Sequence, residues 1–93
     1  MCRVTIRLDP ASSYLEKDLV RAVWSVLGEE DTEWGVNVLS EPTTGNWNVG
    51  AQPGDGQPFH AVLDDSQHSA EAVRHVVLGF LQQYREWMLD NEE

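Results

Sequence analysis

Basic residues are scarce in this 93-residue sequence. Six lysines and arginines stand against 16 aspartates and glutamates, which gives a formal net charge of −10, and Lys17 is the sole lysine. Nucleic acids and anionic membranes both attract proteins through Lys and Arg side chains. The charge therefore argues against direct binding to either of them and favours a basic protein as partner.

Cysteine is also nearly absent. The single cysteine, Cys2, excludes an internal disulfide and a zinc site built from several cysteines. The sequence lacks an apolar run of the roughly 18 residues that a membrane span requires, an N-terminal signal pattern and internal repeats. We expect one compact acidic domain over residues 1–93, with an acidic tail at 90–93 that can fray, in the reducing cytoplasm.

Hydrophobic periodicity predicts four strands and two helices. Alternating apolar residues or short apolar runs mark strands at 2–8, 34–39, 46–51 and 59–63. Apolar residues recur at helical spacing before Gly28 and again over about 67–89. The predicted fold class is α+β in the order β-α-β-β-β-α, a three- to four-stranded, mostly antiparallel sheet with both helices packed on one face. The position of the first strand in the sheet is left open.

Local signals place the helix ends and the core face. Gly28 is expected to end the first helix in a left-handed conformation, and Asp65 or Ser66 to cap the second. The second helix is expected to bury one stripe, made of Val73, Val77, Phe80, Leu81, Tyr84 and Met88. The uncovered sheet face is expected to be polar and to carry Arg3, Thr5, Arg7, Asn37, Asn46, Asn48 and His60.

Residues capable of catalysis are present but not in a recognisable pattern. Cys2 falls on the inward phase of its strand and is expected to be packed there. His68 and His75 lie two helical turns apart, about 10 Å, which is too far for one metal ion. His60 with Asp64 or Asp65 is an open alternative for an acid–base site, although adjacent carboxylates at a helix start are explained by capping. We expect no enzyme activity, no cofactor and no metal.

Four tryptophans supply large apolar surfaces. Trp34 and Trp47 lie on predicted strands, where they face the helices or each other. Trp24 and Trp87 fall on the flanks of helical stripes, and Trp87 is expected to be partly exposed. The acids that follow or precede it are Glu86, Asp90, Glu92 and Glu93.

The α-β-β-β-α order after the first strand is similar to that of double-stranded-RNA-binding domains. Those domains hold phosphates with lysines at the start of their last helix. Here that segment reads "DDSQHSAEAVRHVV", with Arg74 as its one base. The resemblance therefore implies an arrangement of elements and no RNA binding.

Acidity, small size and the missing catalytic pattern together favour a binding role. We expect an inhibitor whose carboxylates stand in for phosphates in a basic site. Phage- or mobile-element-encoded anti-defence (anti-CRISPR-like) proteins and nuclease-toxin immunity proteins are of this kind. The expected contact residues are Glu29, Glu30, Asp31, Glu33, Trp34, Trp87, Asp90, Glu92 and Glu93. The alternative is a structural or assembly subunit that forms a homodimer, with acidity serving solubility.

Overall fold

A computed structural model describes residues 2–8, 13–54 and 56–90 of the chain. It confirms the α+β fold and the predicted order of elements. These elements are β1 (Cys2–Arg7), α1 (Ser13–Leu27), β2 (Trp34–Ser40), β3 (Trp47–Pro53), β4 (Phe59–Leu63), the short 3-10 helix η1 (Asp65–Gln67) and α2 (Ala70–Asp90).

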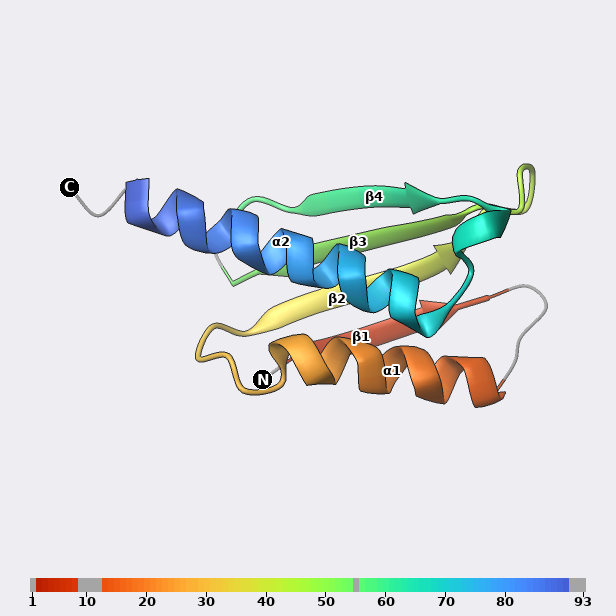
Figure 1. Ribbon diagram of the computed structural model, residues 1–93, viewed down its shortest axis with the longest axis horizontal. Coiled ribbons are helices and arrows are strands. Elements are labelled where there is room, and N and C mark those ends of the chain that lie inside the picture. Colours follow the sequence, from red (N-terminus) through yellow and green to blue (C-terminus); the bar gives the residue numbers. More distant parts are fainter. Residues whose placement is uncertain (1, 9–12, 55, 91–93) are drawn as a thin grey trace.

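The four strands form one sheet in the order β1-β2-β3-β4. Helix α1 crosses over from β1 to β2, so these two strands run parallel, whereas β2, β3 and β4 pair antiparallel as successive hairpins. The sheet is therefore mixed, and β1 lies at its edge, which the sequence left open. Both helices lie on the same face of the sheet, with α1 near β1 and α2 near β3 and β4 (Figure 1).

The core fills the space between the sheet and the two helices. Alternation along the strands turns Trp34, Val36 and Val38 of β2 inward, and Trp47, Val49 and Ala51 of β3 likewise. They meet the apolar stripes of the helices, whose buried members are Leu19, Ala22, Val23, Leu27, Val73, Val77, Phe80 and Leu81. The two tryptophans face the helices and not each other, because Trp34 pairs with Pro53 and Trp47 with Ser40 and Leu63.

Two details of the second helix differ from expectation. Asp64 caps η1 by accepting a hydrogen bond from the Ser66 N–H at 3.0 Å, and α2 starts only at Ala70, where the Ser69 hydroxyl accepts from Ala72 N–H at 3.1 Å. At the other end, Met88 is 42% exposed and does not join the buried stripe. The reason is length: 21 helical residues span about 32 Å, whereas the strands, of seven residues at most, span about 23 Å. The last turns of α2 extend past the sheet (Figure 1).

Gly28 ends α1, but not in the left-handed conformation, since positive φ angles occur at Gly45 and Gly54 among the described glycines. Its N–H donates to Trp24 O at 2.9 Å. A Cβ at Gly28 would lie 2.5 Å from that oxygen and 2.7 Å from the Trp24 ring. Close approach of Trp24, rather than backbone conformation, is what requires glycine here.

We therefore predict that Gly28→Ala destabilises the protein by about 1–3 kcal/mol, because Trp24 or the chain must shift to admit the methyl group. The control is Gly35→Ala, since a Cβ at Gly35 meets nothing within 4 Å. Ala is favoured over Gly in a strand, so that variant should be neutral or more stable by about 0.5–1 kcal/mol. Chemical denaturation measures both changes; equal effects of the two variants would contradict the steric explanation.

Candidate functional site

The predicted contact residues converge on one end of the molecule. The loop 28–33, between α1 and β2, lies beside the last turns of α2 (Figure 1). A hollow of about 410 Å³ is lined by both segments, through Glu30, Asp31, Tyr84, Met88 and Leu89 among others. We call residues 29–33 and 84–90 together the acidic end. Glu92 and Glu93 lie outside the described residues.

One ion pair holds the loop against the helix. Arg85 Nη2 donates to both carboxylate oxygens of Glu30, at 3.2 and 3.1 Å. The Arg85 side chain is 60% exposed, so solvent screens the pair, whose contribution to stability is below about 1 kcal/mol. Glu29, Asp31 and Glu33 are exposed and form no ion pair with the described residues. The three other carboxylates of the loop thus remain uncompensated.

Apolar side chains are exposed on the last turns of α2, and two of them, Met88 and Leu89, line the same hollow as Asp31. Trp87, Met88 and Leu89 are 50%, 42% and 68% exposed. The expectation that Trp87 is partly exposed is confirmed. Its ring also borders a second hollow of about 320 Å³, formed with Gln57, Pro58 and other residues. Consecutive large apolar residues on the surface of a small domain are a mark of interaction sites.

A chain of aromatic contacts connects Trp87 to the core. Its ring lies 6.1 Å from that of Tyr84, which in turn meets Trp34 edge-on at 5.3 Å. Phe59 stacks against both Trp34, at 6.2 Å, and Phe80, at 5.5 Å. Trp34 restricts the position of the Tyr84 ring, and Tyr84 restricts that of the Trp87 ring. Trp87 is therefore held by packing and not only by its place at the end of a helix.

Trp34 is itself fully buried, so the expectation that it touches a partner is wrong. Its role is to support Tyr84 and, through it, the exposed Trp87. Its indole Nε1 is buried and has no hydrogen-bond partner in the described part of the chain. The alternating pattern of its strand, which places Trp34 with Val36 and Val38, carried this signal.

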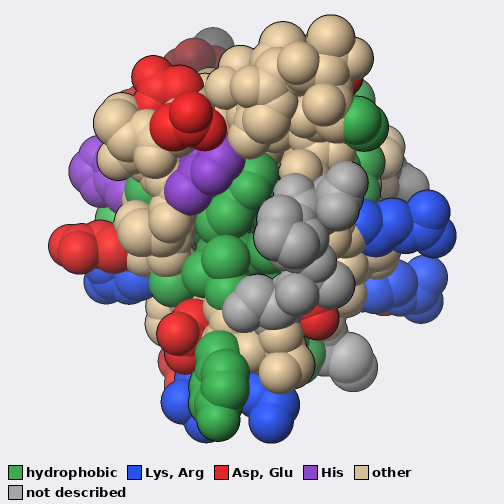
Figure 2. Space-filling view, turned by 90° about the vertical axis from the view of Figure 1, so that its right-hand side faces the viewer, with side chains coloured by type: hydrophobic (Ala, Val, Ile, Leu, Met, Phe, Trp, Pro, Cys, Tyr) green, Lys and Arg blue, Asp and Glu red, His purple; other side chains and the backbone are tan. Residues whose placement is uncertain are grey.

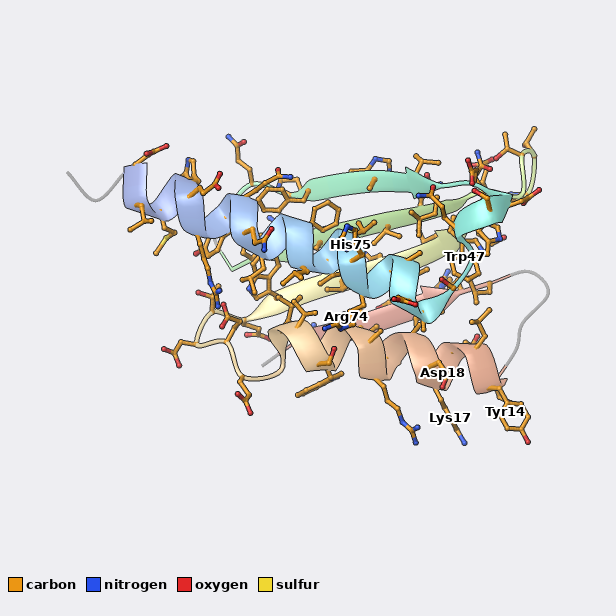
Figure 3. The ribbon with its side chains drawn as sticks, viewed as in Figure 1. Tyr14, Lys17, Asp18, Trp47, Arg74 and His75 are labelled. Carbon is orange, nitrogen blue, oxygen red and sulfur yellow. The ribbon has the colours of Figure 1, made fainter. Side chains whose placement is uncertain are left out.

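Carboxylates are not confined to the acidic end. Six more lie at or near the opposite end of the molecule, on the start of α1, the β2–β3 turn, η1 and the start of α2: Glu16, Asp18, Glu41, Asp64, Asp65 and Glu71. Figure 2 shows the acidic side chains of this end in separate groups, with histidine, basic and hydrophobic side chains between. On α1, Tyr14, Lys17 and Asp18 point away from the sheet (Figure 3). Exposed apolar residues occur near the opposite end too, as Tyr14, Leu39 and Val62, but singly; three in succession distinguish the acidic end.

The structure does not assemble the acid–base alternative. His60 is exposed on the uncovered sheet face, whereas the Asp64 carboxylate accepts hydrogen bonds from the Ser66 hydroxyl and N–H, which lower the pKa of Asp64. His68 stacks on Trp47 at 4.2 Å, with Nε2 3.3 Å from Leu63 O. Within residues 2–8, 13–54 and 56–90, no three His, Cys, Asp or Glu side chains are grouped as metal ligands.

Comparison with known protein families, curated proteins and solved structures found no match. No helix in the described ranges is long and apolar enough to span a membrane.

Cys2 is buried on the inward side of β1, as expected from its phase. Burial raises the pKa of its thiol, so near pH 8 less of it is thiolate than in an exposed cysteine. We predict that a disulfide reagent reacts with Cys2 at least about 10-fold more slowly in the folded protein than in guanidinium, and that the folded rate rises as pH approaches the raised pKa. Complete reaction of the native protein within mixing time would show that the thiol is accessible.

Proposed function

We propose that this protein is a non-catalytic binding protein, an inhibitor that inserts its acidic end into a basic, nucleic-acid-binding site on a protein partner. The observation that supports it most is that the exposed Met88 and Leu89 line one hollow with Glu30 and Asp31 of the loop, with Trp87 exposed on the same turns of α2. Acidity alone serves solubility equally well, and acids occur at both ends of the molecule. Exposed apolar residues do not serve solubility, and they coincide with the acids at this end.

The two kinds of side chain have different tasks in this proposal. Glu29, Asp31 and Glu33 take the places of phosphates opposite Lys and Arg of the partner, and their charge accelerates the encounter. Trp87 enters an apolar pocket, as aromatic residues near the centre of protein interfaces commonly do, and slows dissociation. A protein that blocks a site in this way needs no catalytic group. Antagonism of a nucleic-acid-handling defence complex or of a nuclease toxin is the biological setting that this mechanism fits.

Charge reversal at the acidic end tests the proposal. Glu29→Lys, Asp31→Lys and Glu33→Lys, made together, should weaken partner binding at least about 10-fold, because attraction at the basic site becomes repulsion. Glu30 is left intact, since it anchors the loop to Arg85. Immobilised wild-type and variant proteins would be compared for capture of proteins from the source cells, at about 50 and 300 mM salt, and captured proteins tested for competition by a nucleic-acid oligonucleotide.

The matched control changes the net charge equally at the opposite end. Asp18→Lys, Glu41→Lys and Glu71→Lys should leave capture within about two-fold of wild type, because salt at these concentrations screens charges that lie far from the interface. If both triple variants lose the partner alike, net charge and not this surface is responsible. If capture is insensitive to salt, phosphate mimicry is the wrong mechanism.

The contribution of apolar contacts to partner binding is tested with two tryptophans of similar exposure. Trp87 at the acidic end is 50% exposed and Trp24 on α1 is 45% exposed. We predict that Trp87→Ala reduces affinity by about 2 kcal/mol or more, mainly through faster dissociation, whereas Trp24→Ala changes it little. Surface plasmon resonance with the captured partner gives both rate constants. Equal losses for the two variants would remove Trp87 as the anchor.

A homodimeric assembly subunit is the alternative, and sedimentation of the wild-type protein distinguishes it. Under this alternative the protein is a dimer at micromolar concentration, and both charge-reversed variants keep their function. Nothing at the acidic end favours it, because a symmetric contact there would bring like charges together.

A further inference from the structure

The four strands are free of acidic residues, in a chain that has 16 of them. No Asp or Glu occurs in Cys2–Arg7, Trp34–Ser40, Trp47–Pro53 or Phe59–Leu63. The charged and titratable side chains that these strands turn outward are Arg3, Arg7 and His60. The strands are exposed to solvent on the uncovered face of the sheet. The arginines give that face positive charge in a protein of net charge −10.

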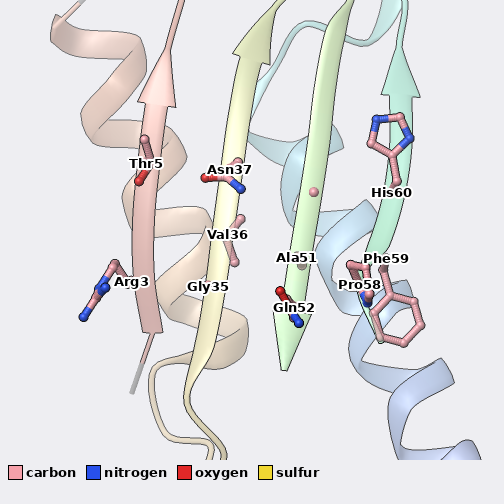
Figure 4. A pocket seen from close by; sticks show the side chains of 11 residues that line it. Arg3, Thr5, Gly35, Val36, Asn37, Ala51, Gln52, Pro58, Phe59 and His60 are labelled. Atoms are coloured by element: carbon pink, nitrogen blue, oxygen red, sulfur yellow. The ribbon is translucent and has the colours of Figure 1, made fainter. Parts of the chain in front are cut away.

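Strand register arranges this face in rows across the sheet. Thr5, Asn37, Gly50 and His60 form one row. Arg3, Gly35 and Gln52 form the next. These two rows surround a hollow of about 310 Å³ on the uncovered face (Figure 4). Arg3 lies on one side of the hollow and His60 on the other, with Asn37 and Gln52 between them (Figure 4).

Two glycines form the floor of the hollow, and the fold does not need either of them. Neither is among the described glycines with positive φ. A Cβ at Gly35 would meet nothing within 4 Å, and one at Gly50 would meet only Phe59 O, at 3.8 Å. Glycine weakens a strand, and in a strand interior it often marks close approach of a ligand or of another chain. Here the missing side chains keep the hollow open at the expense of strand stability.

The spacing of Arg3 and His60 restricts what the hollow holds. Arg3 and His60 lie on the two edge strands, three strand spacings or about 14 Å apart, so one anionic group does not reach both. The exposed amides of Asn37 and Gln52 lie in the space between and offer donors and acceptors to a peptide main chain, although Gln52 Nε2 also donates to Gly56 O at 3.3 Å. Glu33 shares a neighbouring hollow with Arg3 but forms no ion pair with it among the described residues, so the guanidinium remains available.

We propose that the uncovered sheet face is a second binding site, which takes an extended acidic peptide segment across Gly35 and Gly50 with carboxylates directed to Arg3 and His60. The site borders the acidic end at Glu33, which lines a neighbouring hollow with Arg3, but has the opposite polarity. A nucleic-acid strand is disfavoured, because each of its nucleotides adds a negative charge and Arg3 is the one lysine or arginine that lines the hollow in the described residues, whereas the peptide brings only the two carboxylates that Arg3 and His60 receive.

The test is a nuclear magnetic resonance titration of the full chain with a blocked pentapeptide, glutamate at both ends and three serines between. Wild type should show saturable shifts confined to backbone amides of the four strands. The matched peptide with glutamine in place of glutamate should bind about 10-fold more weakly or not at all, and Arg3→Gln should weaken binding of the acidic peptide to a similar extent.

Filling the hollow gives the sharpest result, because stability and binding change in opposite directions. Gly35→Val and Gly50→Val should each raise the melting temperature by about 2–8 °C and abolish the shifts. Gly79→Ala on α2, where a Cβ also meets nothing within 4 Å, is the control that should raise stability and leave binding unchanged. Lower stability of the valine variants would show that the fold needs these glycines and would overturn the proposal.

Three further outcomes would also overturn the proposal. The first is the absence of a saturable shift with the acidic peptide, and the second is equal binding of glutarate, which would make the ligand a small dicarboxylate. The third is a wild-type dimer that buries this face. None of them concerns the acidic end, so the proposed inhibitory function would stand or fall separately.

Discussion

The packing of α2 against the sheet through aromatic rings is the interaction on which both surfaces depend. Trp34 on β2 contacts Tyr84 of the helix and Phe59 on β4 contacts Phe80, with ring centroids 5.3 and 5.5 Å apart. These contacts set where along the sheet the helix lies. Because the helix is longer than the strands, fixing its position at the aromatic cluster also fixes how far its last turns project. Trp87, Met88 and Leu89 are exposed as a consequence of that length difference.

The same two-layer arrangement separates the charges. Inward strand positions must be apolar to meet the helices, and acids are kept to helices, turns and loops. The second sheet face has no helix to cover it, and there the outward positions hold arginine, amides, small residues, a histidine and two exposed apolar residues, Leu39 and Val62. A molecule of net charge −10 consequently has one sheet face whose strands carry no carboxylate, with Glu33 at its border. Helices on a single face make this possible; a sheet covered on both faces would have no such surface.

Periodicity was sufficient to predict the elements and the side that each strand buries. Alternation in "CRVTIRL" and "WGVNVL" is a local property, and the structure follows it residue by residue. The parallel pairing of β1 at the edge was not predictable from pattern alone, because it depends on the α1 crossover and long-range contacts. Gly28 was correctly placed at a helix end but for the wrong reason: the proximity of Trp24 is a tertiary contact that no rule for helix ends contains. Met88 was misassigned because helical spacing identifies a face without regard to where the sheet beneath it stops.

The candidate sites divide in the same way. Local sequence located the loop acids and the exposure of Trp87, but whether 29–33 lies near 84–90 is a question of topology, and the Glu30–Arg85 contact joins residues 55 positions apart. Gly35 and Gly50 carry no signal when read singly, since each looks like an ordinary weak position in a strand. Register makes them diagonal neighbours on adjacent strands, and only then does the absence of two side chains become one hollow. The sequence does not show whether a Cβ would have room at these two positions. The structure shows that it would, so packing within the chain does not explain why either residue is glycine.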